Sequence, residues 1–195
     1  MKTTDSAAEL LFATGNYRKI NEANSTLAQY GITVKPVKIE IDEIQSTDPS
    51  NITKAKARAA FTLLGEPVVV SDSSWSIPAL GGFPGGYMHD INEWWDEQHW
   101  IDIMANREDK TIILQEHIAY CDGEQVVHFS QDYHGVFLGH PQGPIVNEND
   151  SFERVASLDG VRSLAERQAD VVANGETKKF EHWQKFGEWF ISHDK

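Results

Sequence analysis

Residues 10–19 have the sequence LLFATGNYRK, in which a short apolar run leads into a tight turn and then into polar residues. The apolar run over residues 10–13 predicts a strand, because it is brief and stops at a turn-forming pair, Gly15 and Asn16. From residue 17 to residue 30, Ile20 and Leu27 recur at helical spacing among polar residues, and Gly31 marks a stop. The stretch therefore predicts a strand, a turn and a helix in direct succession.

The same alternation continues towards the middle of the chain. Residues 32–41 alternate apolar and polar side chains and predict a second strand, with Pro36 favouring an edge position or a bulge. Residues 51–64 are rich in alanine and leucine and predict a helix that ends at Gly65. The apolar run at residues 67–70 predicts a buried strand, followed at once by the polar residues 71–74.

The second half of the chain predicts hairpins and further helices. The expected elements are a turn assembly at residues 81–86, a helix at 91–105, strands at 111–120, 125–129 and 133–138, and helices at 163–173 and 180–191. Asp122 and Gly123 join the first two of these strands as a hairpin turn. Strands that first alternate with helices and then form hairpins predict an α/β fold with a mixed sheet flanked by helices. Without repeats or linkers, we expect one domain over residues 1–195.

Composition excludes several classes of protein. The chain of 195 residues has 17 lysines and arginines against 30 aspartates and glutamates, a net charge of −13. Without a basic run it is not expected to bind nucleic acid, since phosphate affinity needs clustered cations. Its one cysteine, Cys121, excludes an internal disulfide and a multi-cysteine zinc site. No apolar run approaches the roughly 20 residues that span a bilayer, so we expect a cytoplasmic protein with no membrane partner.

The turn between the first strand and the first helix could hold a phosphate group. A helix start offers free backbone N–H groups and a positive dipole end, and Gly15 permits close approach. Lys19, one turn into the helix, could add a point charge. An ordinary N-cap made by Thr14 or Asn16 explains the same turn, and for the turn alone that is the commoner outcome.

Acidic side chains gather where the second and third expected strands end. They are Glu40, Asp42, Glu43 and Asp48 after the second strand, and Asp72 after the third. Ligands of open α/β sheets bind at the carboxyl ends of strands, and carboxylates beside a polyphosphate need a cation. Mg²⁺ suits this set, because it is usually held by one or two carboxylates together with substrate phosphates. A solvated acidic edge is the alternative for any one of these residues.

The helix expected at residues 51–64 carries three cations. Lys54 and Arg58 share a face, whereas Lys56 points elsewhere. In a chain with few cations such a local cluster is noteworthy, although a solvated helix face is the default.

Five segments in this order resemble the inosine triphosphate pyrophosphatase family. They are FATGNYRK (12–19), IDEIQ (41–45), KARAA (56–60), VSDS (70–73) and ALGGFPGGY (79–87). They span roughly the first half of the chain, and their common order makes the match far more specific than any single turn.

The resemblance implies a two-lobed α/β fold with a long mixed sheet and a central cleft. It also implies a homodimer that hydrolyses a nucleoside triphosphate to the monophosphate and pyrophosphate with Mg²⁺. The residue roles that it implies are phosphate binding by Thr14, Asn16, Lys19, Lys56 and Ser73, metal binding by Glu43 and Asp72, and catalysis by Asp72 with Lys19. The aromatic segment from Trp94 to Trp100 is a candidate dimer surface.

Two departures from the family pattern bear on activity and specificity. The family usually carries a second carboxylate where this chain has Ser71, so a nucleotide-binding protein without turnover is the alternative function. The family's base-binding segments are altered here, and a lysine that belongs to them falls near Lys178 or Lys179. A rebuilt base pocket implies a substrate with another non-standard or modified base, because unpaired polar groups penalise the wrong one. The candidate base contacts are Trp75, Phe152, His182 and Trp183.

Overall fold

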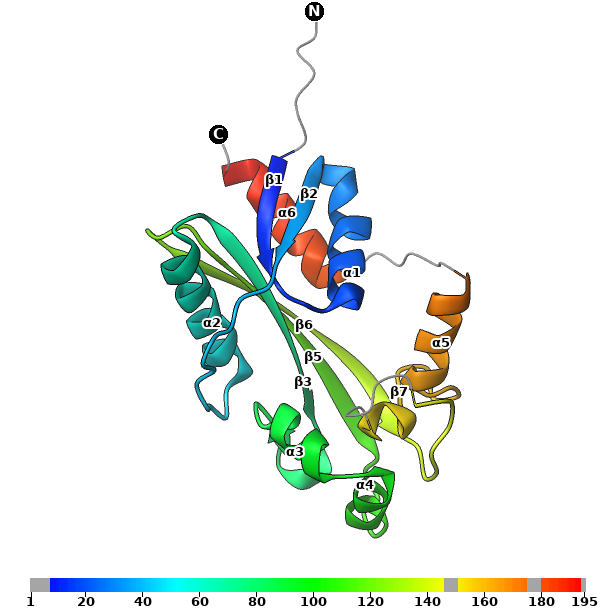
Figure 1. Cartoon of the computed structure of the whole chain (residues 1–195). Coiled ribbons are helices and arrows are strands. Elements are labelled where there is room, and N and C mark those ends of the chain that lie inside the picture. The colour runs from blue at the N-terminus through cyan, green and yellow to red at the C-terminus, as the bar shows by residue number, and fades with distance from the viewer. Residues whose placement is uncertain (1–7, 146–150, 175–179, 194–195) are drawn as a thin grey trace, which may run out of the picture.

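The computed structural model describes residues 8–145, 151–174 and 180–193, which form one mixed sheet flanked by helices (Figure 1). The strands are β1 (Ala8–Ala13), β2 (Ile32–Val37), β3 (Val68–Ser76), β4 (Pro84–Gly85), β5 (Thr111–Cys121), β6 (Val126–Phe137) and β7 (Ala156–Ser157). Their order is β2-β1-β3-β5-β6-β7, and β4 pairs with β3. β1 is parallel to β2 and β3, and the remaining pairs are antiparallel. The mixed α/β sheet predicted from the sequence is confirmed.

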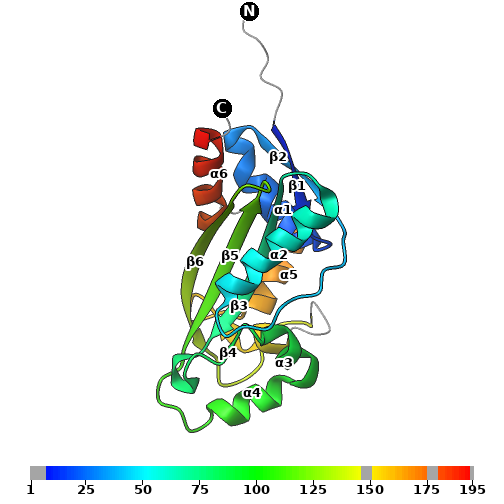
Figure 2. The same ribbon diagram turned by 90° about the vertical axis from the view of Figure 1, so that its left-hand side faces the viewer.

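In the described residues, six α-helices flank this sheet. They are α1 (Tyr17–Leu27), α2 (Pro49–Leu64), α3 (Met88–Trp94), α4 (Glu97–Met104), α5 (Leu164–Asn174) and α6 (Glu181–His193). α1 and α6 lie on one face beside β1 and β2, and α2 covers the opposite face (Figures 1 and 2). α3, α4 and α5 lie at the other end of the long strands, so the helices form two lobes joined by β3, β5 and β6. No helix in the described ranges has the length and apolar character needed to cross a membrane.

Among the described residues, three apolar clusters hold these layers together. One packs α1 and α6 against the sheet around Phe12 and Trp183, and another packs α2 against the opposite face around Ala57 and Ala60. The third fills the second lobe around Trp100. Each helix therefore buries one apolar face against the sheet or its lobe, as layered α/β packing requires.

Several element boundaries differ from those expected. The strands expected at 125–129 and 133–138 are one strand, β6, because an unbroken ladder with β5 carries it through the polar residues between them. The helix expected at 91–105 is two helices, since the Asp96 side chain accepts from the His99 N–H at 3.0 Å and caps a new start. The second strand ends at Val37 rather than Ile41, although Pro36 does lie on an edge strand.

The difference that matters most for function is in β3. The polar residues 71–74 were expected to follow the strand, but they lie inside it, because β5 pairs with β3 along its whole length. On the other side, β1 pairs only with Val68 and Val69, and β4 only with Trp75 and Ser76. Among the described strands, none pairs with residues 70–74 on that side. This stretch of β3 is therefore an open edge between the two lobes.

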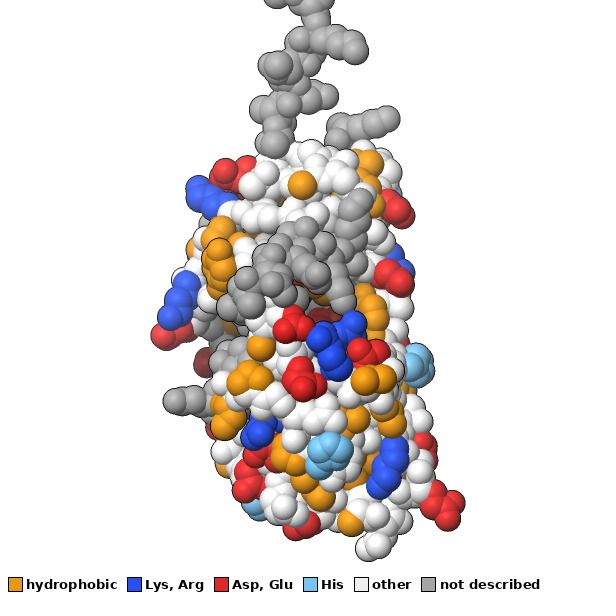
Figure 3. Space-filling view, turned by 90° about the vertical axis from the view of Figure 1, so that its right-hand side faces the viewer, with side chains coloured by type: hydrophobic (Ala, Val, Ile, Leu, Met, Phe, Trp, Pro, Cys, Tyr) orange, Lys and Arg blue, Asp and Glu red, His pale blue; other side chains and the backbone are white. Residues whose placement is uncertain are grey.

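The surface that carries α5 shows how the net negative charge is distributed. Acidic and basic side chains are interspersed on this face (Figure 3). Arg162 Nη1 lies 2.6 Å from Asp170 Oδ2, and Arg167 Nη1 lies 3.7 Å from Asp159 Oδ2. Arg162 and Arg167 are therefore paired with carboxylates on this face.

Candidate active site

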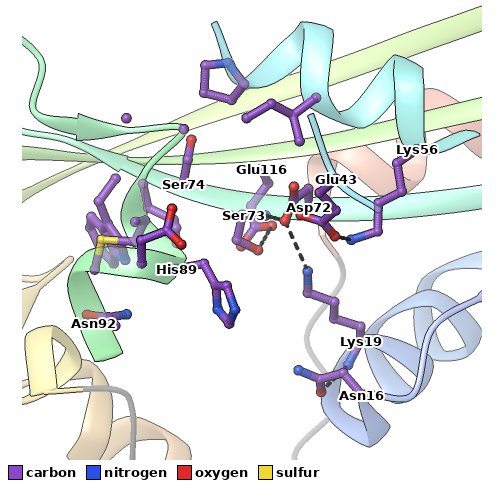
Figure 4. Close-up of a pocket in the computed structure, with 18 of the residues that line it drawn as sticks. Asn16, Lys19, Glu43, Lys56, Asp72, Ser73, Ser74, His89, Asn92 and Glu116 are labelled. Carbon is purple, nitrogen blue, oxygen red and sulfur yellow. Dashed lines mark hydrogen bonds and ion pairs between the residues drawn. The ribbon is translucent and has the colours of Figure 1, made fainter. Parts of the chain in front are cut away.

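A cavity of about 650 Å³ opens along the uncovered edge of β3. Its walls come from the start of α1, residues 41–45, α2, β3, α3 and α5, so both lobes contribute. Figure 4 shows Lys19, Lys56, Glu43, Asp72 and Glu116 gathered at one end. His89 and Asn92 of α3 lie towards the other end.

The open edge of β3 presents two backbone groups that β1 would otherwise pair. Lys19 takes the first, because its Nζ donates to the carbonyl oxygen of Ser71 at 3.3 Å. Asp72 takes the second, because its Oδ1 accepts from the N–H of Ser73 at 3.0 Å. Lys19 Nζ lies 4.0 Å from the same Asp72 Oδ1. The missing strand pairing therefore places a lysine and a carboxylate side by side on the cavity wall.

The start of α1 forms the neighbouring wall. Asn16 is the N-cap and its Oδ1 accepts from the backbone N–H groups of Arg18 and Lys19, at 2.9 and 3.3 Å. Thr14 Oγ1 in turn accepts from the Asn16 N–H at 3.1 Å. The N-cap alternative is therefore realised, yet Asn16 and Lys19 also line the cavity. Thr14 and Gly15 belong to the same turn but do not line it.

Lys56 and Glu43 form the third wall. The Lys56 ammonium group donates to Glu43 Oε1, which ties α2 to residues 41–45. Burial alone would lower the pKa of Lys56, but the carboxylates of Asp72 and Glu43 raise it above its ordinary value. Lys56 is therefore a fixed positive charge that faces two carboxylates, whereas Lys54 does not line the cavity.

The donor set at this end suits Mg²⁺. Within the described part of the chain, no group of three or more histidine, cysteine, aspartate or glutamate side chains forms a preassembled metal cage. The predicted ligands Glu43 and Asp72 offer only carboxylate oxygens. The charge of Lys56 interacts favourably with both carboxylates. Mg²⁺ is commonly held by one or two carboxylates plus substrate phosphates, with waters completing its shell. These residues fit such an ion better than they fit zinc, which prefers nitrogen and sulfur ligands.

Comparison with known proteins identifies the family of this chain. A family model described as the Ham1 family matches residues 10–153, which is most of the chain and includes every cavity wall named above except α5. The chain belongs to the Ham1 family. Its sequence is 34% identical over 136 residues to a dITP/XTP pyrophosphatase of Methanopyrus kandleri, covering 69% of this chain and 72% of that one.

A second relative extends the likeness over the full length. An inosine triphosphate pyrophosphatase of Aspergillus oryzae is 31% identical over 193 residues, covering 96% of each chain. Among solved structures, a HAM1 protein from Coxiella burnetii has a TM-score of 0.74 at 18% identity, covering 95% of this chain and 99% of that one. That structure supports the fold, and the curated relatives support the family.

The proposed base contacts are not brought together in this Ham1 fold. Trp75 lines the cavity but is 5% exposed, with its ring edge-on to Phe152 at 5.0 Å. Phe152 is fully buried in the cluster of the second lobe. Trp183 packs in the cluster under α1 and α6, and His182 is buried beside Tyr133. The last three do not line the cavity, and burial accounts for them as interior side chains. Lys178 and Lys179 lie outside the described residues.

Polar side chains of other segments occupy the end of the cavity away from Lys19. They include Ser74 of β3 and His89 and Asn92 of α3 (Figure 4), and Gln168 of α5 also lines the cavity. Met88, Leu114 and Leu164 add apolar surface. Sequence reasoning missed α3 and α5 as walls because neither carries a motif, and only the tertiary arrangement places them opposite the β3 edge.

Glu116 is a buried carboxylate of the cavity that sequence reasoning missed. It lies on β5 directly across from Ser73, lines the cavity and is 7% exposed. The signal was present, since Gln115, Glu116 and His117 are three polar residues in succession inside an otherwise apolar strand. A buried strand that retains a charge there indicates a neighbouring polar site.

His182 gives a prediction about stability in acid. Burial lowers the pKa of its imidazole from 6.5 to about 3, and the positive charge of Lys19 adds to the effect. The unfolded chain therefore gains a proton below pH 6.5 that the folded protein cannot take up. Replacing His182 by glutamine should remove an acid penalty of about 2 kcal/mol between pH 7 and pH 5. Urea unfolding of both proteins at the two pH values measures it.

The comparison must be made between variants because Glu22 acts in the opposite direction. Burial raises the pKa of Glu22 to about 7, so its contribution to stability improves as the pH falls. The wild-type curve alone is therefore a sum of opposing contributions. An identical change between pH 7 and pH 5 in wild type and His182→Gln would contradict the assignment of His182.

Proposed function

We propose that the protein hydrolyses a nucleoside triphosphate to the monophosphate and pyrophosphate, with Mg²⁺ as its cofactor. The observation that carries the proposal is the end of the cavity at which Lys19, Lys56 and Asp72 converge from three walls. A triphosphate carries several negative charges, and this acidic chain places two of its few lysines together at one site. The pyrophosphatase names of the curated relatives support the same reaction.

Different residues of the cavity would serve different steps of phosphoryl transfer. Lys19, Lys56 and the positive dipole end at the start of α1 are positioned to neutralise phosphate charge, which is most of what this reaction requires. Asn16 orients the helix start, and the Ser73 hydroxyl offers a further polar contact on β3. Mg²⁺ held by Glu43 and Asp72 would neutralise charge on the phosphate oxygens. Asp72 would also orient a water molecule beside the phosphate chain.

The nucleoside would occupy the other end of the cavity. Apolar walls from Trp75 and Met88 can cover the faces of a base, while His89, Asn92 and Gln168 can meet its edge. Sites that hydrogen-bond a base discriminate strongly, because a wrong base leaves buried groups unpaired. The curated relatives are named for inosine, deoxyinosine and xanthosine triphosphates. We propose that the substrate here has a non-standard or modified base of this general kind.

A substrate screen tests the function directly. The full chain with Mg²⁺ is incubated with standard, deaminated and modified NTPs and dNTPs, and pyrophosphate and monophosphate are measured by chromatography. We expect equal amounts of the two products from at least one deaminated or modified nucleotide, and loss of turnover with EDTA. Release of inorganic phosphate with a diphosphate product, or no product from any nucleotide, would overturn the proposal.

A second candidate is nucleotide binding without turnover. Ser71 stands where the resemblance leads us to expect an acid, and its buried hydroxyl has no hydrogen-bond partner among the described residues. Calorimetry that detects triphosphate binding while the screen finds no product would favour this function.

A cytoplasmic homodimer completes the proposal. Trp94 is 70% exposed, beside the half-buried Trp95, and large exposed aromatic side chains are enriched at protein interfaces. Light scattering coupled to size exclusion should give the mass of a dimer, about twice 22.0 kDa. Trp94→Ala should shift that mass towards the monomer.

Replacing Lys56 by methionine tests the phosphate end of the cavity. The variant keeps the aliphatic stem but removes a charge-assisted contact worth about 1.5–3 kcal/mol. It also leaves the Glu43 carboxylate without its cation, which adds repulsion towards phosphate. We therefore expect KM for the triphosphate to rise by roughly 10-fold or more. Lys54→Met on the same helix is the control and should change KM less than twofold; equal effects from both would refute a specific role for Lys56.

A further inference from the structure

A buried carboxylate in the cavity has no role in the scheme above. Glu116 is 7% exposed, and its Oε2 accepts a hydrogen bond from the Ser73 hydroxyl at 2.7 Å. Burying a charged carboxylate costs free energy unless partners compensate. Ser73 supplies a single neutral partner, and among the described residues no cation lies within ion-pair distance of Glu116. Stability alone therefore does not explain why a carboxylate side chain is retained at this position.

The position of Glu116 in the sheet points it at the cavity. Leu114, Glu116 and Ile118 share one face of β5, since side chains alternate along a strand. Leu114 packs against the apolar cluster of the second lobe, and Ile118 belongs to the cluster under α1 and α6. Glu116 therefore lies in the gap between two apolar cores, which is where the cavity opens (Figure 4). An apolar residue there would join the cores, whereas a carboxylate keeps the gap polar.

The neighbouring strand presents only hydroxyl groups on that face. Ser73 is directly across from Glu116, and Ser71 is across from Ile118, one step along the same face. Neither serine can take up a proton from water at neutral pH. Asp72, between them, is engaged by Lys19 and by the N–H of Ser73. Glu116 is therefore the carboxylate of this face that is placed to act on a water molecule in the cavity.

We propose that Glu116 is a catalytic carboxylate, oriented through Oε2 by Ser73, whose Oε1 receives the proton of the attacking water. The oxygen of that water forms a bond to the α-phosphorus. The bond from the α-phosphorus to the bridging oxygen breaks, and its electron pair leaves with pyrophosphate. The proton passes to Glu116 and returns to solvent as product leaves. The inference rests on the proposed function and adds a residue on β5 to the groups that act on the phosphate chain.

The test separates turnover from binding. Glu116→Gln keeps the shape and the contact with Ser73, so triphosphate affinity should be unchanged while kcat falls by about 100-fold or more. Affinity is measured by calorimetry with a non-hydrolysable triphosphate analogue and Mg²⁺, and kcat with the substrate found in the screen. Asp132→Asn, which removes an exposed carboxylate on the adjacent β6, is the matched control and should retain wild-type kcat.

Relocating the carboxylate guards against a misfolded variant. In the Glu116→Gln background, Ser71→Glu places an acid on the same face of the neighbouring strand, and it should restore at least 10-fold of the lost kcat. If the wild-type protein turns over substrate and Glu116→Gln keeps the full kcat, the inference is wrong. The proposed function would then still stand. Equal losses of affinity and kcat/KM would also overturn the inference, since Glu116 would then act only in binding. Wild type without turnover would instead be a failure of the proposed function.

Discussion

Replacing Asp72 by asparagine is expected to lower kcat by at least about 100-fold, because the variant removes a carboxylate that would hold the metal and orient water. Asparagine has nearly the same shape, and its Oδ1 can still accept the Ser73 N–H that now bonds to Asp72. The open edge of β3 should therefore stay intact. Initial rates of pyrophosphate release measure the loss.

Binding gives the sharper part of the same prediction. Asp72 contributes negative charge to a cavity that would hold a triphosphate. It also offsets part of the positive charge that Lys19 and Lys56 would present to phosphate. Removing that charge should leave metal-free affinity for a triphosphate analogue unchanged or tighter, while affinity in the presence of Mg²⁺ falls. Asp170→Asn, far along α5 in an exposed ion pair, is the control. A variant with kcat within threefold of wild type would contradict a catalytic role for Asp72.

Local sequence signals were sufficient for the first lobe. The apolar run before Gly15, the cap at Asn16 and the stop at Gly31 are each short-range features, and the structure has the strand and helix that they predict. The same holds for α2, which ends at Gly65 with a left-handed φ of 70°. Caps and glycine stops depend on residues within one helical turn, so they can be read from the local sequence without knowing the tertiary contacts.

The open edge of β3 could not be predicted in this way. Asp72 was expected beyond the end of a strand, and it lies in the middle of one. The strand continues because β5 supplies partners about 45 residues later in the chain, and the edge is open because β1 stops at Ala13. Pairing with β5 and the early end of β1 both depend on residues far away in the sequence. The pattern of residues 67–76 therefore does not predict either of them. Glu116 was missed for the same reason, since its distance to Ser73 follows only from the β3–β5 register.

The base contacts show the limit of motif comparison when a motif has changed. His182 and Trp183 were assigned by position relative to family segments, yet the helix that carries them turns both towards the interior. Aromatic residues at the start of an amphipathic helix can pack in the core as readily as they can line a ligand pocket. The sequence pattern is the same in both cases. The cavity is instead lined at that end by α3 and α5, which carry no motif.

Trp183→Ala distinguishes these two roles and should have the largest effect on stability of any substitution considered. Trp183 is 1% exposed, with its ring edge-on to Phe12 at 5.2 Å and to Phe186 at 5.9 Å. Removing a buried tryptophan leaves a cavity where α6 meets the sheet, so the free energy of unfolding should fall by about 3–5 kcal/mol. Urea unfolding measures this loss, and Leu63→Ala, which truncates a side chain that is 61% exposed on α2, should cost less than about 0.5 kcal/mol.

Substrate affinity then decides between packing and recognition. A core residue outside the cavity should leave KM of the folded Trp183→Ala protein within about twofold of wild type at a temperature well below its midpoint. A base-stacking residue would raise KM by roughly 5-fold or more, since such stacking is worth about 1–3 kcal/mol. Trp183→Phe provides the same comparison in a more stable protein, because a smaller ring still fills part of the space beside Phe12. A raised KM with little loss of stability would return Trp183 to the base pocket and require α6 to move towards the cavity when substrate binds.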